Sequence, residues 1–374
     1  MLQSYETRTL RPLKSGSSLK LTDITARATR LEAYDGHERI WLGEDHERGL
    51  TAIVAIHNTA LGPALGGTRV WPHPTFEAAL TDALRLSRGM TYKAAITNMP
   101  YGGGKAVIVA DPRTDKTPAM LEAYAEMLAA LNGQYFTGED VGLTLADADF
   151  LRARTPNVTG TTIGGSGNPS PVTAQGVFLG IKAALRHRNG NDAMSGLRIA
   201  VQGLGSVGWS LCEKLHAEGA SLVVADLDEA RVRKAMETFH AEAVAGDAIV
   251  AADVDLFAPC ALGGILSADT IPTLKAKIVA GAANNQLERH EDARRLMAQG
   301  VLYAPDYVIN AGGLINVATE LDPDGYDREA AMTKVELIPQ TLSDIFRRAD
   351  SDARPTNDIA QAMGEERIAR ARAA

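Results

Sequence analysis

The sequence predicts an α/β protein built from two domains, and three observations support this prediction. The chain has 374 residues, a length typical of about two domains. Strand-like apolar runs alternate with helical patterns along the second half, which indicates parallel strands in a doubly wound sheet. A stretch rich in Gly, Ser, Thr and Pro, residues 159–171, separates that half from a first half with strands and helices of its own.

The first half is expected to contain a hairpin, two helices and a buried strand. Strand-like sequence flanks a polar turn within residues 38–57. Apolar residues at helical spacing follow Thr75, whose hydroxyl suits an N-cap. Residues 106–110 are apolar enough for a buried strand, and residues 117–133 fit an amphipathic helix that ends with a glycine.

The second half follows a regular alternation. We expect helices over residues 172–188, 207–219 and 228–239, and strands over residues 198–203, 221–226, 254–259 and 277–281. From about residue 330 onward the sequence is charged and helical, with no strand pattern.

The composition narrows the class of protein. Acids outnumber bases, 46 to 38, which disfavours a nucleic-acid binder. The N-terminus lacks the apolar run of a signal peptide, and no segment has the length of a membrane span. Cys212 and Cys260 lie far apart in apolar stretches, which favours reduced thiols in a cytoplasmic protein. The eight histidines show no metal-binding spacing, so no metal site is predicted.

A glycine motif follows the first strand of the second half. It reads Gly203-x-Gly205-x-x-Gly208 and opens the next helix. These glycines would permit a tight turn, close approach of a pyrophosphate, and close packing of helix on strand. The amides at the helix start, at Ser206 and Val207, would then hold the phosphates.

Asp226, at the end of the following strand, completes the pattern of a Rossmann domain. An acid there accepts hydrogen bonds from the ribose hydroxyls and repels a 2′-phosphate, so NAD is favoured over NADP. Two alternatives stay open from the residues alone. One is a glycine turn without a cofactor, and the other is a site for FAD or S-adenosylmethionine.

A second glycine cluster marks a candidate chemical site. Residues 102–104 are three glycines directly before Lys105, so the backbone there needs unusual dihedral angles or very close approach by a neighbour. Lys93 precedes this segment and Asp140 follows it. Two nearby ammonium groups lower the pKa of at least one, so one lysine could act as a general base while the other holds a carboxylate. A solvated surface charge is the alternative for either lysine.

Several longer motifs occur in order from about residue 30 to residue 370. They are GPALGGTR, MTYKAA, GGGKAVI, GEDVG, GNPSPVTAQG, ANNQL and YAPDYVINAGGLINVATEL. Together they resemble the Glu/Leu/Phe/Val amino acid dehydrogenase family, and most closely its leucine and phenylalanine dehydrogenases.

The resemblance implies a division of the chain. Residues 1–155 with about 340–374 would form a substrate-binding and oligomerisation domain, and residues 156–339 the Rossmann NAD-binding domain. A deep cleft would separate the two, with part of its hinge near residues 159–171. The family also implies a homo-oligomer, an octamer or a dimer.

The implied reaction is reversible, NAD-dependent oxidative deamination of an L-amino acid to its 2-oxo acid and ammonia. Lys93 would bind the substrate carboxylate, Lys105 would activate the water that attacks the imine, and Asp140 would move protons to and from the nitrogen. Three further residues would contact the amino group or the cofactor: Asn284, Asn310 and Thr173.

The substrate side chain would meet Leu65, Gly138, Leu314 and Val317, all apolar or lacking a side chain. A glutamate carboxylate would lie unpaired there, so a hydrophobic substrate is favoured. Gly138 and Leu314 follow the phenylalanine enzymes by family pattern, and neutral packing is the alternative explanation. An enzyme that accepts branched-chain and aromatic substrates is favoured, and the choice between leucine and phenylalanine as the preferred one stays open. The remaining alternatives are another enzyme on the same fold, a family member with an altered substrate, a non-catalytic NAD sensor, and a structural oligomer subunit.

Overall fold

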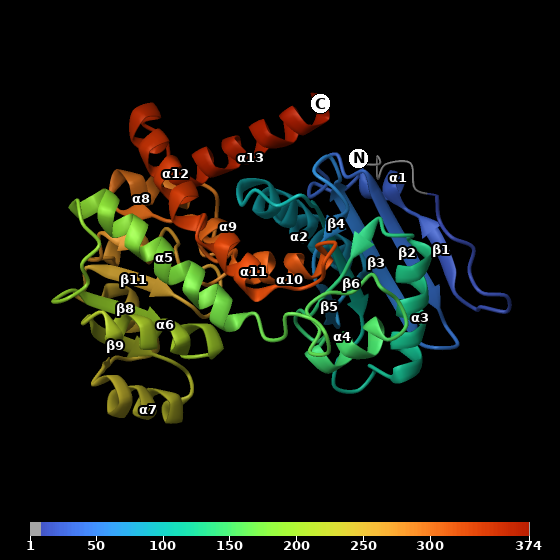
Figure 1. The fold of residues 1–374 in the computed structure, drawn as a ribbon, viewed down its shortest axis with the longest axis horizontal. Coiled ribbons are helices and arrows are strands. Elements are labelled where there is room, and N and C mark those ends of the chain that lie inside the picture. Colours follow the sequence, from blue (N-terminus) through green and yellow to red (C-terminus); the bar gives the residue numbers. More distant parts are fainter. Residues whose placement is uncertain (1–8, 374) are drawn as a thin grey trace. The chain divides into compact units, whose positions relative to one another are not determined.

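The apolar strands of the first half assemble into one mixed sheet (Figure 1). The computed structural model describes residues 9–373. The sheet runs in the order β1-β2-β3-β6-β4-β7, and β5 also pairs with β6. Its strands are β1 (Lys20–Asp23), β2 (Arg39–Asp45), β3 (Leu50–Asn58), β4 (Ala64–Leu65), β5 (Thr68–Trp71), β6 (Gly102–Val109) and β7 (Tyr135–Phe136). The hairpin expected within residues 38–57 is the antiparallel pair β2 and β3.

Side chains alternate between the two faces of this sheet, because successive residues of a strand point to opposite sides. Ile53 and Val107 pack with helix α2 (Phe76–Ile96) on one face. Val54 and Ile108 pack with helix α3 (Pro118–Ala130) on the other. The strand β6 is therefore covered on both sides.

Both helices begin where the sequence predicts. The Thr75 hydroxyl accepts a hydrogen bond from the amide of Ala78, and Thr117 does the same for Met120. These contacts satisfy amide groups that lack a partner within the helix. The helix α3 ends at Ala130, before the expected glycine, and the chain then turns away through residues with positive φ.

The second half forms a wholly parallel sheet. Its strands are β8 (Arg198–Gln202), β9 (Ser221–Ala225), β10 (Glu242–Ala243), β11 (Leu256–Pro259), β12 (Ile278–Val279) and β13 (Leu302–Tyr303). The spatial order is β10-β9-β8-β11-β12-β13. Counted from β8, this is the order 3-2-1-4-5-6 of a dinucleotide-binding Rossmann sheet. The predicted doubly wound domain is confirmed.

The other elements connect or cover the two sheets. They are α1 (Thr25–Ala28), α4 (Leu145–Arg152), α5 (Ser170–Asn189), α6 (Ser206–Ala217), α7 (Glu229–Phe239), η2 (Gly246–Ala251), η3 (Ile271–Thr273), α8 (Asp292–Ala298), α9 (Asp306–Ile309), α10 (Gly312–Ala318), η4 (Thr319–Leu321), α11 (Arg328–Val335), α12 (Ile338–Asp352) and α13 (Thr356–Ala373). Within the described residues, none of these helices combines the length and apolar character needed to cross a membrane.

The chain divides into two compact units. Unit 1 contains the residues up to Asn168, together with Val317–Arg328 and the residues from Gly364 onward. Unit 2 contains Pro169–Asn316 and Glu329–Met363. The first boundary falls inside the stretch rich in Gly, Ser, Thr and Pro.

The resemblance implied that residues from about 340 onward join the first domain, whereas the two compact units divide these residues at Gly364. Helix α12 lies on α5 within unit 2, because Gly176 and Gly180 leave room for Ile338 and Leu342. A Cβ at Gly180 would lie 2.9 Å from Leu342 Cδ1. The end of α13, from Gly364 onward, packs within unit 1 instead.

Candidate active site

The three glycines before Lys105 form the start of strand β6, and close contact explains them. A Cβ at Gly102 would lie 2.0 Å from the carbonyl oxygen of Asn58, and one at Gly103 would lie 2.1 Å from the amide nitrogen of Thr91. Real Cβ atoms do not approach backbone so closely. Of the two explanations offered by the sequence, close approach by a neighbour is therefore the correct one.

Lys105 follows the glycines on β6 and is buried, with 7% of its surface exposed. It lies two residues before Val107, so its side chain is on the α2 face of the sheet. Its ammonium group donates a hydrogen bond to the carboxylate of Asp140 and forms an ion pair with it. Burial raises the pKa of Asp140, but the charge and hydrogen bond of Lys105 outweigh burial and leave that pKa below its ordinary value. The site therefore holds a charged carboxylate against a buried ammonium.

A tight turn presents Asp140 to Lys105. Backbone hydrogen bonds join Asp140 to Leu143, and the amide of Val70 donates to the carbonyl of Val141 at 2.8 Å. Lys116 donates from Nζ to the carbonyl of Gly142 at 2.9 Å. Lys116 also pairs with the carboxylate of Asp147 at 2.5 Å, and sequence reasoning missed it because no motif specifies its contact with the turn, which is to a backbone oxygen.

Lys93 lies in the last turn of α2 and is half-buried. Its carbonyl oxygen accepts a hydrogen bond of 2.6 Å from the hydroxyl of Thr97, which follows the helix. Lys93 lies on α2 and Lys105 on β6, and these two elements pack directly on each other. The spacing of these lysines in the sequence did not reveal that relation.

Three of the expected side-chain pocket residues belong to unit 1. Leu65 is buried on β4 and pairs with Gly103 of β6. A Cβ at Gly138 would lie 3.2 Å from both Oγ1 and the carbonyl oxygen of Thr159. Val317 lies beside Gly160, the residue after Thr159, since a Cβ at Gly160 would be 3.6 Å from Val317 Cγ1.

Glu320 holds the segment that follows Thr159, and sequence reasoning missed it. One oxygen, Oε1, accepts hydrogen bonds from the amides of Gly160 at 2.9 Å and Ser166 at 2.7 Å. Hydrogen bonds from backbone amides to a charged carboxylate are stronger than those between neutral groups. Glu320 thus fixes the backbone next to Gly138.

In unit 2, the glycine motif forms the turn between β8 and α6. A Cβ at Gly208 would lie 1.9 Å from the carbonyl oxygen of Gly203, so position 208 requires glycine, and Gly203 has a positive φ of 95°. A Cβ at Gly205 would meet no heavy atom within 4 Å. Gly205 is also the N-cap of α6, where no side chain caps the first amides. The open space and the uncapped amides, including those of Ser206 and Val207, fit a pyrophosphate.

Asp226 lies at the end of β9 and ties this turn in place. Its Oδ2 accepts a hydrogen bond from the amide of Leu204 at 2.5 Å, and its Oδ1 accepts one from Asp228 at 2.8 Å. A carboxylate has further lone pairs, so it can still accept from ribose hydroxyls. Asp226 therefore has a structural role that the sequence did not predict.

The remaining predicted residues of unit 2 lie in the loop after β12 (Asn284), at the end of α9 (Asn310), in the first turn of α5 (Thr173) and in α10 (Leu314). Asn310 is buried and donates from Nδ2 to Asn284 Oδ1 at 2.7 Å and to the carbonyl of Ala282 at 3.0 Å. The hydroxyl of Thr173 lies 2.7 Å from the position of a Cβ at Gly313, directly before Leu314.

Gln286 and Asp306 support the loop that carries Asn284. The side-chain amide of Gln286 donates to the carbonyls of Gly281 and Ala283, at 2.8 and 3.0 Å. Asp306 accepts from the amide of Gln286 at 2.9 Å. Both residues lie inside motifs that the sequence analysis quoted, but their partners are backbone groups that the motifs did not identify.

The Rossmann sheet, its glycine turn and the buried lysine–carboxylate pair together have the character of a dehydrogenase. Comparison with known protein families supports the same class of enzyme. Residues 39–157 match the model described as the Glu/Leu/Phe/Val dehydrogenase dimerisation domain. Residues 164–230 and 224–374 match the model of Glutamate/Leucine/Phenylalanine/Valine dehydrogenase. The chain belongs to this family and is an amino acid dehydrogenase, and the family implies a nicotinamide cofactor.

Individual relatives are similar along nearly the whole chain. Leucine dehydrogenase of Geobacillus stearothermophilus is 51% identical over 340 residues, which cover 90% of this chain and 92% of the relative. Phenylalanine dehydrogenase of Bacillus thermotolerans is 41% identical, with 93% of each chain covered. The crystal structure of L-tryptophan dehydrogenase from Nostoc punctiforme superposes with a TM-score of 0.81 at 47% identity, covering 91% of this chain and 98% of that one.

Proposed function

We propose that the chain catalyses the reversible, NAD-dependent oxidative deamination of a hydrophobic L-amino acid to its 2-oxo acid, ammonia and NADH. The observation that carries the proposal is the ion pair between buried Lys105, directly after the glycines of β6, and partly buried Asp140. A buried ammonium and carboxylate in contact can exchange a proton with a reacting group and stabilise its charge. Relatives named leucine, tryptophan and phenylalanine dehydrogenase support the same reaction class.

Each residue of unit 1 has a role in this proposal. Lys93 binds the substrate carboxylate by its charge. Once its ammonium proton has passed to Asp140, neutral Lys105 takes a proton from the water that adds to the imine, and Asp140 carries protons to and from the nitrogen. The contact of Lys105 with Asp140 keeps the two groups close enough for direct proton transfer.

The cofactor assignment rests on unit 2. A nicotinamide, when bound, supplies the acceptor for the hydride that leaves the substrate Cα. Gly203, Gly205 and Gly208, with the amides of Ser206 and Val207, hold the pyrophosphate. Asp226 accepts from the ribose hydroxyls, and its negative charge disfavours a 2′-phosphate, so the preferred cofactor is NAD. Two residues contact the nicotinamide end, Thr173 and Asn284, and Asn310 orients Asn284.

The substrate is hydrophobic because the expected pocket residues carry no charge. Leu65, Gly138, Leu314 and Val317 offer no partner for a second carboxylate, which would cost several kcal/mol to bury unpaired. We propose activity on both branched-chain and aromatic amino acids. The crowding of Gly138 by Thr159 means that even a methyl group there would change the room beside the substrate.

Two further features complete the proposal. We propose a homo-oligomer, an octamer or a dimer, supported by the family description of residues 39–157 as a dimerisation domain. We also propose a cytoplasmic enzyme, supported by Cys212 and Cys260, both of which are free thiols.

The test is a steady-state assay of NADH formation with a panel of Leu, Val, Ile, Phe, Trp, Met and Glu. We expect turnover of the hydrophobic members and none of glutamate. Lys105→Ala and Asp140→Asn should each lower kcat by roughly 10²- to 10⁴-fold, as for loss of a general acid or base. Lys20→Ala changes an exposed lysine on β1 of the same sheet and should keep wild-type activity.

Two outcomes would contradict the proposal. Turnover that survives Lys105→Ala would remove this lysine from the chemistry. Binding of NADH without turnover of any panel member would favour a family member with an altered substrate or a sensing role.

A further inference from the structure

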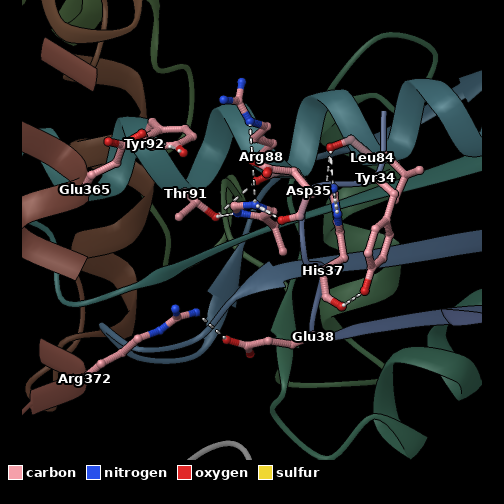
Figure 2. Close-up of polar contacts among 12 residues, drawn as sticks. Tyr34, Asp35, His37, Glu38, Leu84, Arg88, Thr91, Tyr92, Glu365 and Arg372 are labelled. Carbon is pink, nitrogen blue, oxygen red and sulfur yellow. Dashed lines mark hydrogen bonds and ion pairs between the residues drawn. The ribbon is translucent and has the colours of Figure 1, made fainter. Parts of the chain in front are cut away.

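The end of helix α13 packs on the last turns of α2, the helix that carries Lys93. A Cβ at Gly364 would be in ordinary contact with Tyr92, 3.4 Å from its Cδ1 atom. The hydroxyl of Tyr92 donates to Oε1 of Glu365 at 3.4 Å (Figure 2). Tyr92 is the residue directly before Lys93, so these contacts lie beside the expected carboxylate-binding group.

Arg372, about two turns of α13 after Glu365, makes a further contact with unit 1. Its guanidinium lies 4.0 Å from Oε1 of Glu38, as Figure 2 shows. Glu38 in turn accepts hydrogen bonds from the amide and the hydroxyl of Thr59, at 2.9 and 2.6 Å. The C-terminal residues are thus attached to unit 1 on both sides of Arg367.

Arg367, between these contacts, binds the end of α2 directly. Its Nη1 donates to the carbonyls of Ala94 at 3.3 Å and Ala95 at 2.7 Å. Its Nη2 donates to the carbonyl of Met99 at 3.1 Å. The last carbonyls of a helix carry partial negative charge, and a cation there is stabilising. The planar guanidinium can satisfy several such acceptors at once, which an ammonium cannot do with the same geometry.

These three carbonyls belong to residues that lie between Lys93 and Lys105 in the sequence. Ala94 and Ala95 directly follow Lys93, so their position sets the end of the helix from which Lys93 projects. Met99 lies in the short connection from α2 to the glycines and Lys105. A single side chain therefore joins the helix end that carries one lysine to the connection that leads to the other.

We propose that Arg367 is a positioning residue for substrate binding, which holds the last turn of α2 so that Lys93 meets the substrate carboxylate. This inference rests on the proposed function. It assigns to a residue near the C-terminus an effect on affinity for the amino acid and the 2-oxo acid, both of which carry that carboxylate. The cofactor, which unit 2 is proposed to hold, should not be affected.

The experiment compares Arg367→Gln and Arg367→Lys with the wild-type enzyme. We expect Arg367→Gln to raise KM for the amino acid and for the 2-oxo acid by about fivefold or more, the effect of losing charge-assisted hydrogen bonds. The KM for NAD should stay unchanged, and kcat should change less than KM. Arg367→Lys keeps the positive charge but lacks the planar guanidinium, so it should retain part of the affinity for the amino acid and the 2-oxo acid. Arg370→Gln changes an exposed arginine on the same helix and serves as the matched control.

A structural role alone would give a different result. If Arg367→Gln lowered kcat and the thermal midpoint but left KM for the amino acid unchanged, the inference would be wrong. An equal rise in KM for Arg370→Gln would also overturn it, because the effect would then belong to charge on α13 in general.

Binding without turnover separates this inference from the proposed function. The 2-oxo acid corresponding to leucine is titrated into the enzyme with NADH but without ammonia, and its Kd is measured by calorimetry. Weaker binding to Arg367→Gln than to wild type would support the inference even if the amino acid panel failed. Wild-type enzyme that turns over the panel, with equal Kd for the variant, would overturn the inference alone. Wild-type enzyme that neither binds the 2-oxo acid nor turns over the panel would overturn both.

Discussion

At the scale of single residues, the three glycines before Lys105 act by leaving space for close neighbours. Gly102, Gly103 and Gly104 lie in a regular strand, and none of the three needs a positive φ. The atom that they lack would overlap Asn58, Thr91 or Tyr135. The glycines therefore let β6 approach α2 and β3 closely and leave room for the ring of Tyr135, and they set the position of Lys105, the next residue along the strand.

Adding one methyl group tests this directly. We expect Gly103→Ala to lower the free energy of unfolding by at least about 2 kcal/mol, because the new Cβ overlaps backbone that cannot move cheaply. Gly89→Ala is the control, since Gly89 lies exposed on α2 and a Cβ there meets no heavy atom within 4 Å. That change should raise stability by roughly 0.5–1 kcal/mol, because alanine is the better helix former. Urea unfolding of both variants measures the difference, and equal effects would contradict the argument.

At the scale of elements, the sequence predicted those whose signals are local. The cap at Thr75 marked the start of α2, the amphipathic pattern from residue 117 marked α3, and the glycine motif marked the turn from β8 to α6. The strands β4 and β7 were missed because each has two residues and is flanked by polar residues, glycine or proline, whereas the equally short β12 lies within a longer apolar run that was predicted. Such short strands are specified by pairing with distant sequence, here through β6 and β4.

The same reasoning explains which parts of the site were predictable. Lys105 and Asp140 stood out because glycines or a family motif surrounded them. Lys116, Glu320 and Arg367 did not, since each binds backbone amides or carbonyls. Every residue type has a backbone carbonyl, and all but proline have an amide N–H, so the sequence does not show which residue will bind Lys116, Glu320 or Arg367.

Lys116 allows a prediction about the turn that carries Asp140. It is bonded to the carbonyl of Gly142 and to the carboxylate of Asp147, which caps α4. Lys116→Met should loosen the turn and lower kcat by at least about tenfold, since small misplacements of a proton-carrying group are costly. The KM for NAD should not change. Steady-state kinetics beside Lys20→Met, on exposed β1, tests this, and an unchanged kcat would remove Lys116 from the positioning of Asp140.

At the scale of the whole molecule, unit 1 depends on both ends of the chain. Val317–Arg328 and the residues from Gly364 onward join it only after unit 2 has been traversed in sequence. Contacts such as Arg367 with Ala95 therefore form between residues far apart in the chain, and they close long loops at an entropic cost. It follows that the stability of unit 1 is a property of the full chain.

A buried histidine pair gives that stability a dependence on pH. The rings of His37 and His57 pack edge to face at 4.7 Å. Asp35 and Arg88 lie beside them, and Figure 2 shows both with His37. His57 bonds through Nδ1 to the hydroxyl of Thr91 at 2.8 Å and through Nε2 to the carbonyl of Asp35 at 3.1 Å. Burial lowers the pKa of both histidines, and His37 adds to this at His57, whose pKa falls to about 4. The native state therefore keeps both rings neutral at neutral pH.

The sign of the effect follows from proton uptake on unfolding. An unfolded histidine has a pKa of 6.5, so between about pH 6.5 and pH 4 the unfolded chain binds more protons than the native one. The free energy of unfolding should fall across this range as the pH is lowered, by up to about 3 kcal/mol from His57. Urea unfolding at about pH 7.5 and about pH 5 measures the difference, which should shrink in His57→Gln. It should persist in His46→Gln, a change at an exposed histidine. A difference that stays at the wild-type value in His57→Gln would show that other groups control acid stability.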